Sequence, residues 1–207
     1  MLDNYDRNDE GLIYQINPTP ITYDHEYVAS RYDTYGELNG MMSHLRLGYI
    51  VGALGRRPES ICDVGYGNGA FLKACRNAIP DRYGFDVTDY PVPQGVRFTK
   101  NWLDLEVDVL TFFDVLEHFE DPYVLRQCRA ENVVISLPWC HYESDEWFDR
   151  WKHRRPNEHL WHFDLHGMTN FARVCGFKLA DFSDVEDIIR RPETDRPNIL
   201  TVLLKRA

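Results

Sequence analysis

Residues 61–69 read Ile-Cys-Asp-Val-Gly-Tyr-Gly-Asn-Gly, an apolar strand that breaks into a glycine-rich turn. Gly65, Gly67 and Gly69 stand at alternate positions, and glycine lets a backbone bend tightly and approach a ligand closely. Apolar residues then recur at helical spacing through residues 71–78, so we expect a helix to begin directly after the turn. A strand, a glycine turn and a helix N-terminus together are typical of a nucleotide-cofactor site.

Two interpretations of this turn compete. As G-x-G-x-x-A, from Gly65 to Ala70, it indicates a dinucleotide site, with Asp86, 21 residues after Gly65, as the ribose-binding acid. As D-x-G-x-G-x-G, from Asp63, it is the first motif of class I S-adenosylmethionine (SAM) methyltransferases. Asp63 favours SAM, because a carboxylate repels a pyrophosphate but suits the sulfonium and α-ammonium charges of SAM.

Three ordered segments resemble class I SAM-dependent methyltransferases: residues 61–69, 83–87 and 108–122. The last contains Asp-Val-Leu-Glu-His at 114–118, which is similar to the branch of ubiquinone-biosynthesis O-methyltransferases. Residues 45–50, Leu-Arg-Leu-Gly-Tyr-Ile, resemble the helix that precedes the first motif in that branch. The resemblance implies a Rossmann-like fold, a SAM cofactor with S-adenosylhomocysteine (SAH) as its product, and methylation of a small-molecule acceptor, with O-methylation as the first choice.

The order of elements predicts an α/β fold with a doubly wound, mostly parallel seven-stranded sheet and an antiparallel C-terminal hairpin. We expect residues 1–40 to form an N-terminal arm or lid and residues 41–207 to form the SAM-binding domain. Residues 139–163, rich in tryptophan, are expected to form an irregular loop on the acceptor side. The expected strands are 60–64, 82–86, 96–99, 108–113, 132–137, 177–185 and 198–205, and the expected helices are 41–54, 69–78, 122–129 and 165–175.

Several residues follow strand ends, where open α/β sheets bind ligands. Asp86 ends the second strand, where a carboxylate can accept both ribose hydroxyls. Asn101 and Trp102 follow the third strand, where relatives contact adenine, and Trp102 either stacks on the base or belongs to the core. Arg46 either pairs with the methionine carboxylate of SAM or is a solvated helix residue. The expected cofactor-binding residues are Arg46, Asp63, Gly65, Tyr66, Gly67, Gly69, Asp86, Val87, Asn101, Trp102, Phe113 and Asp114.

Candidate catalytic residues are fewer. Methyl transfer depends mostly on positioning, and a general base is needed only where the acceptor must lose a proton. His118, after the fourth strand, and His141, after the fifth, are the candidate bases, and each has a structural histidine as its alternative. His159, His162 and His166 have the spacing H-x2-H-x3-H, which fits no compact closed zinc site, so we expect no metal.

Composition narrows the function classes further. A formal net charge of −10 argues against a nucleic-acid partner. Five cysteines without paired spacing, a polar N-terminus and the lack of a long apolar run favour a cytoplasmic protein with reduced thiols and no membrane span. The alternatives to O-methylation are N- or C-methylation, possibly of a nucleobase, a catalytically silent SAM- or SAH-binding protein and, more distantly, an NAD-dependent oxidoreductase. The sequence does not predict an oligomeric state.

Overall fold

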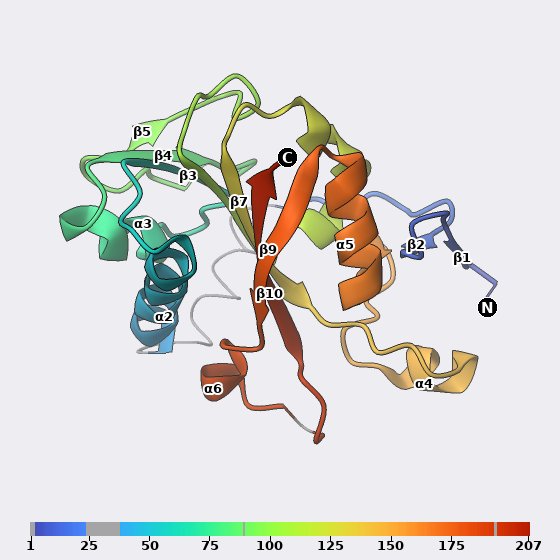
Figure 1. Ribbon diagram of the computed structural model, residues 1–207. Helices are drawn as coiled ribbons and strands as arrows, with labels where there is room; N and C mark the ends of the chain where they lie inside the picture. Colours follow the sequence, from blue (N-terminus) through green and yellow to red (C-terminus); the bar gives the residue numbers. More distant parts are fainter. Residues whose placement is uncertain (1–2, 24–37, 89, 193) are drawn as a thin grey trace.

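The computed structural model describes residues 3–23, 38–88, 90–192 and 194–207, and Figure 1 shows a twisted central sheet at its centre. This sheet has seven strands in the order β5-β4-β3-β6-β7-β10-β9. The first five strands of that order run parallel, and β10 pairs antiparallel with both β7 and β9. The predicted fold class, including the C-terminal hairpin, is confirmed. The strands are β3 (Ser60–Val64), β4 (Asp81–Phe85), β5 (Arg97–Phe98), β6 (Val109–Phe113), β7 (Asn132–Pro138), β9 (Phe177–Ser183) and β10 (Ile199–Arg206).

Helices cover both faces of the sheet. α2 (Leu38–Leu54) and α3 (Ala70–Ala74) lie on one face, and α5 (Leu165–Val174) lies on the other (Figure 1). Along β7, Val133 and Ile135 belong to the core on the α5 side, whereas Val134 belongs to the core under α2 and α3. Because successive strand residues face opposite sides, a strand covered on both sides must be apolar throughout. This explains why β7 is a continuous buried run.

Two expected helices are shorter and tighter than predicted. The segment 69–78 is α-helical only in α3 and then continues as one 3₁₀ turn, η1 (Cys75–Asn77). The segment 122–129 is a 3₁₀ helix, η3 (Pro122–Gln127), and not an α-helix. Periodicity of apolar residues does not separate these helix types over so few residues. The remaining short helices are η2 (Leu116–His118), α4 (Asp145–Arg150) and α6 (Asp187–Arg190).

The described N-terminal residues and the tryptophan-rich segment form one unit, residues 3–23 with 139–163, which we call the cap. Strands β1 (Tyr5–Arg7), β2 (Ile13–Gln15) and β8 (Trp161–His162) make a three-stranded sheet in it. Tyr5, Ile13, Cys140 and Phe148 form a small separate core. Residues 24–37 of the expected arm lie outside the described residues. The segment was expected to be irregular, but β8 pairs with β2 of the distant N-terminal hairpin, and α4 packs on that hairpin through Phe148 against Tyr5.

Two features concern the state of the thiols and the character of the helices. All five cysteines are free and buried. Across the described ranges, none of the helices has the length and apolar character needed to cross a membrane.

Gly84 in β4 supplies a test of the packing under the glycine turn. An added Cβ would lie 2.8 Å from Tyr66 Cδ1 and 3.2 Å from Leu72 Cδ1. We therefore expect Gly84→Ala to lower the free energy of unfolding by about 1–3 kcal/mol through overpacking. The matched control is Gly48→Ala in α2, where the described residues beyond the helix's own backbone leave 4 Å of space around the added Cβ. Alanine is the better helix former, so this change should stabilise by about 0.5–1 kcal/mol. Urea denaturation measures both, and equal effects would contradict the packing at Gly84.

Candidate functional site

The glycine turn joins β3 to α3 and needs glycine for both conformation and space. Gly65, Gly67 and Gly69 have φ angles of 75°, 52° and 70°, in the left-handed region that other residues rarely adopt. A Cβ on Gly65 would lie 2.5 Å from Val115 Cγ2, and one on Gly69 would lie 2.2 Å from Pro93 Cγ. The segments that follow β4 and β6 therefore close directly onto this turn.

Asp63 lies just before the turn and is almost wholly buried, with 4% of its surface exposed. Its Oδ1 accepts a hydrogen bond of 2.7 Å from the Thr111 hydroxyl on the neighbouring strand β6. Burial raises the pKa of Asp63 to about 7 and the Asp86 charge acts in the same direction, although the Thr111 hydrogen bond and the Arg46 charge lower it. A cation placed beside this carboxylate would therefore favour its ionised form.

Asp86 follows β4 and is bonded to the same turn. Its Oδ2 accepts from the Gly67 amide at 2.8 Å, and its Oδ1 accepts from the Thr88 amide and hydroxyl at 2.8 and 2.7 Å. An ionised carboxylate offers about four acceptor positions, so these three bonds fix Asp86 and leave capacity for a ligand hydroxyl. Val87, the next residue, is 73% exposed.

The residues expected around adenine separate into buried and exposed ones. Trp102 is 6% exposed and packs edge-to-face on Phe112, with ring centroids 5.3 Å apart. Of the two alternatives for Trp102, these contacts favour a core position, and its contact with adenine stays a prediction. Asn101 is exposed, and its side chain bonds Asp104. Tyr66 is also buried, and its hydroxyl donates to the Tyr90 carbonyl.

A network of four charges spans the carboxyl end of β6. Arg46 in α2 donates to Glu186 at 2.7 Å and to Asp114 at 3.0 Å, and Arg190 in α6 pairs with both acids. The Arg46 guanidinium also lies 4.3 Å from the centre of the Phe113 ring. Although burial would raise it, the pKa of Asp114 is held below its ordinary value by Arg190 and Arg46.

This network changes what was expected of Arg46 and Asp114. The partners of Arg46 in the structure are two carboxylates of the protein, and its contact with a cofactor carboxylate stays a prediction. The sequence reasoning missed Glu186 and Arg190, which come from the connection between β9 and β10. The signals that could have found them are weak: an acid and an arginine at i and i+4 are common on solvated helices.

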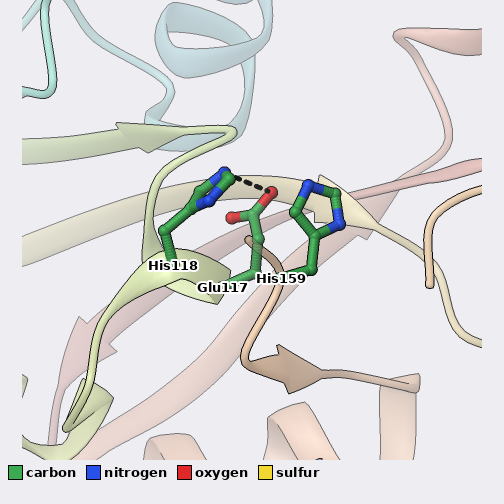
Figure 2. A group of neighbouring side chains, drawn as sticks. All are labelled: Glu117, His118 and His159. Carbon is green, nitrogen blue, oxygen red and sulfur yellow. Dashed lines mark ion pairs between the residues drawn. The ribbon is translucent and has the colours of Figure 1, made fainter. Parts of the chain in front are cut away.

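A second cluster lies where η2 meets the cap. Figure 2 shows His118 and His159 turned toward the carboxylate of Glu117, which lies between them. Glu117 is 1% exposed and His159 is 5% exposed, and the potential ligand atoms of the three residues lie within 4.8 Å of one another. Burial raises the pKa of Glu117 well above its ordinary value, and the Asp114 charge adds to this. The sequence reasoning considered His159 with His162 and His166, but the structure groups it with Glu117 and His118 instead.

The hydrogen bonds determine which nitrogen of each histidine carries the proton. His118 Nδ1 lies 2.8 Å from the Glu158 carbonyl, and His159 Nδ1 lies 2.8 Å from the His153 carbonyl. A carbonyl can only accept, so Nδ1 is the protonated nitrogen in both rings and Nε2 keeps its lone pair. Burial lowers the pKa of each ring below that of an exposed histidine, which keeps both neutral. Each Nε2 is therefore available as a base or as a metal ligand.

His141, the other candidate base, lies elsewhere. Its Nε2 donates to the Pro197 carbonyl at 2.8 Å, and its ring stacks on Trp139 with centroids 5.2 Å apart. It faces the connection between β9 and β10 and is not part of the Glu117 cluster. The structure thus brings one of the two candidate bases to the end of β6 and holds the other by a structural hydrogen bond.

Two hollows lined by described residues lie away from the carboxyl ends of the strands. A pocket of about 580 Å³ lies between residues 57–59 and 76–80, at the amino ends of β3 and β4. Ligands of open α/β sheets bind at the opposite, carboxyl ends. A smaller pocket of about 150 Å³ lies inside the cap beside Tyr5 and Arg154. It is below the roughly 300–1,000 Å³ of small-molecule sites, so the strand ends remain the better guide.

Comparisons with known proteins identify the family of this chain and solved structures with a similar fold. A family model described as a methyltransferase domain matches residues 43–181. No curated protein matches the chain. Among solved structures, a chain of the Haloferax volcanii complex between the Trm112 methyltransferase activator and a methyltransferase has a TM-score of 0.61 and 16% identity. That match covers 90% of this chain and 99% of the other.

Two further structures contain SAH. Synechocystis magnesium protoporphyrin IX methyltransferase has a TM-score of 0.59 and 15% identity, covering 86% of this chain and 94% of the other. Burkholderia thailandensis 1,6-didemethyltoxoflavin-N1-methyltransferase has a TM-score of 0.58 and 15% identity, covering 99% of both chains. Identities this low show the shared fold alone. Because the family model spans more than half of the chain, the protein belongs to the methyltransferase-domain family and is a class I SAM-dependent methyltransferase.

Proposed function

We propose that this enzyme transfers the methyl group of SAM to an oxygen atom of a small-molecule acceptor, bound between the carboxyl end of β6 and the cap. The observation that carries the proposal is His118, which follows β6 and keeps an unprotonated Nε2. Its side chain is 15% exposed, so a small group can reach it. A hydroxyl acceptor needs a partner for its proton, and an imidazole lone pair is a suitable one.

The sequence around His118 supports oxygen as the receiving atom. Residues 114–118, Asp-Val-Leu-Glu-His, are similar to the ubiquinone-biosynthesis O-methyltransferases. Structural neighbours include an enzyme named for N1-methylation, so the fold by itself does not choose the acceptor atom. The cap offers stacked aromatic pairs, such as Tyr14 with Trp161 at 5.2 Å between centroids. Such rings suit a planar acceptor, because they supply flat apolar area.

The cofactor pose follows from the turn. The α-ammonium group of SAM lies near Asp63, and a ribose hydroxyl binds Asp86, whose carboxylate is already fixed beside Gly67. The turn glycines supply the left-handed backbone that faces the cofactor, and exposed Asn101 is our candidate for the adenine contact. This pose places the methyl group toward the end of β6, where His118 lies.

Replacement of Asp86 tests the ribose contact. We expect Asp86→Ala to weaken both SAM and SAH by about 1–3 kcal/mol, because a charged hydrogen-bond acceptor is lost and the two ligands share the ribose. Isothermal titration calorimetry measures both affinities. Asp81→Ala, an exposed acid at the opposite end of β4, is the control and should bind as the wild type does. A loss confined to SAM would mean that Asp86 responds to the sulfonium charge instead.

Replacement of His118 tests the acceptor chemistry. With methyl-labelled SAM and a panel of phenol, carboxylate and amine acceptors, label should appear as a methyl ether or ester. His118→Ala should lower kcat by about 10²–10⁴ and leave SAH affinity nearly unchanged, because the lost group acts on the acceptor. His166→Ala, an exposed histidine on α5, is the matched control. Label found only on nitrogen or carbon, or full activity of His118→Ala, would contradict the proposal.

A further inference from the structure

Glu117 is a buried acid whose side chain lacks a hydrogen-bond partner in the described part of the chain. Neither of its carboxylate oxygens has a hydrogen-bond partner among the described residues, and both are shielded from solvent. Its residue exposure is 1%. Burying a carboxyl group without hydrogen bonds is costly, and groups of this kind in native proteins call for an explanation. A ligand that binds oxygen would supply one.

Two histidine nitrogens with free lone pairs lie beside this carboxylate. His118 Nε2 is 4.0 Å from Glu117 Oε1, and the ligand atoms of Glu117, His118 and His159 all lie within 4.8 Å of one another (Figure 2). Ligands of a tetrahedral metal ion lie about 3.4 Å apart when the metal bonds are about 2.1 Å long. Side-chain rotations that move each ligand atom by roughly 1 Å therefore bring the three atoms to bonding positions.

The remaining nitrogen of each ring is held as in metal sites. His118 Nδ1–H donates to the Glu158 carbonyl, and His159 Nδ1–H donates to the His153 carbonyl. Metal-binding histidines almost always donate their other N–H to a carbonyl or carboxylate, which fixes the ring and directs the lone pair at the metal. Both His118 and His159 have such a hydrogen bond, and both lie beside the Glu117 carboxylate, which accepts no hydrogen bond from the described residues.

We propose that Glu117, His118 and His159 bind a divalent transition-metal ion of the zinc class. Two imidazoles and one carboxylate suit Zn²⁺ and similar ions, whereas Mg²⁺ and Ca²⁺ prefer sites made of oxygen. The ion would join the end of β6 to the cap, where the Leu160 amide already donates to the Glu117 carbonyl at 2.8 Å.

Three protein ligands leave one position open for a further ligand. An acceptor hydroxyl bound there would release its proton to solvent water more easily, because a metal lowers the pKa of a coordinated oxygen. The oxygen would then form its bond to the methyl carbon as the bond from that carbon to the sulfur of SAM breaks, and SAH would leave. His118 would then act as a ligand, and the metal would activate the acceptor. This second step rests on the proposed O-methylation, whereas metal binding does not.

Metal binding is tested on the full chain after dialysis against a chelator. Equilibrium dialysis with Zn²⁺ should give one tightly bound ion per chain, and Mg²⁺ should not saturate. Glu117→Gln and His159→Asn should each weaken Zn²⁺ at least about tenfold. His166→Asn, which removes a histidine outside the cluster, should bind as the wild type does. Circular dichroism and SAH titration show whether each variant is folded.

Cobalt substitution supplies a second readout. Co²⁺ bound to the wild type should give the intense visible bands of tetrahedral coordination, and His159→Asn should lose them. The proposal is overturned if folded His159→Asn binds Zn²⁺ and Co²⁺ as the wild type does, or if the wild type binds neither. Methyl transfer is measured separately: full activity without metal would contradict only the activation of the acceptor, and N- or C-methylation with Zn²⁺ bound would contradict only the proposed function.

Discussion

A buried carboxylate, Asp63, lies near the end of β3, and the cofactor preference that we propose for this enzyme depends on its charge. Asp63 is held by Thr111 from the neighbouring strand and is shielded from solvent. A pyrophosphate beside it would add a second negative charge where burial already raises the pKa of the acid to about 7. A ligand with an ammonium and a sulfonium group has the opposite effect. In the proposed site the glycine turn supplies the backbone that faces the nucleoside, and Asp63 supplies the preference for a cationic ligand.

A second set of charges lies at the carboxyl end of β6. Arg46 and Arg190 neutralise Asp114 and Glu186, and Ser136 on β7 donates to Glu186 at 2.7 Å. Removing one member of a buried ion pair leaves the other charge uncompensated, which is strongly destabilising. The network therefore ties the connection between β9 and β10 to α2 and to the end of β6. The cap closes the other side of His118 and contributes His159 beside it.

Local patterns predicted the parts of the fold that local interactions determine. The strands, the helix ending before Gly176 and the glycine turn all follow from periodicity and from residues that need special φ angles. Contacts between distant segments were not predictable in this way. The core position of Trp102 depends on its contact with Phe112 of β6, and the partners of Arg46 are the distant residues Asp114 and Glu186. The grouping of Glu117 with His159 likewise exists only after the cap has folded onto η2.

Calorimetric titration of SAH into the wild type and into Asp63→Asn, at about pH 6 and about pH 8, tests the role of the buried carboxylate most directly. Asp63 faces Thr111, Arg46 and Asp86, and its pKa of about 7 lies between these values. The wild type should bind SAH up to about tenfold more tightly at the higher pH, because the ionised fraction rises by that factor. Asp63→Asn should bind weakly at both, and NAD should not bind the wild type. Equal SAH affinity of the two proteins at the higher pH, or saturable binding of NAD, would contradict a cofactor site selected by the charge of Asp63.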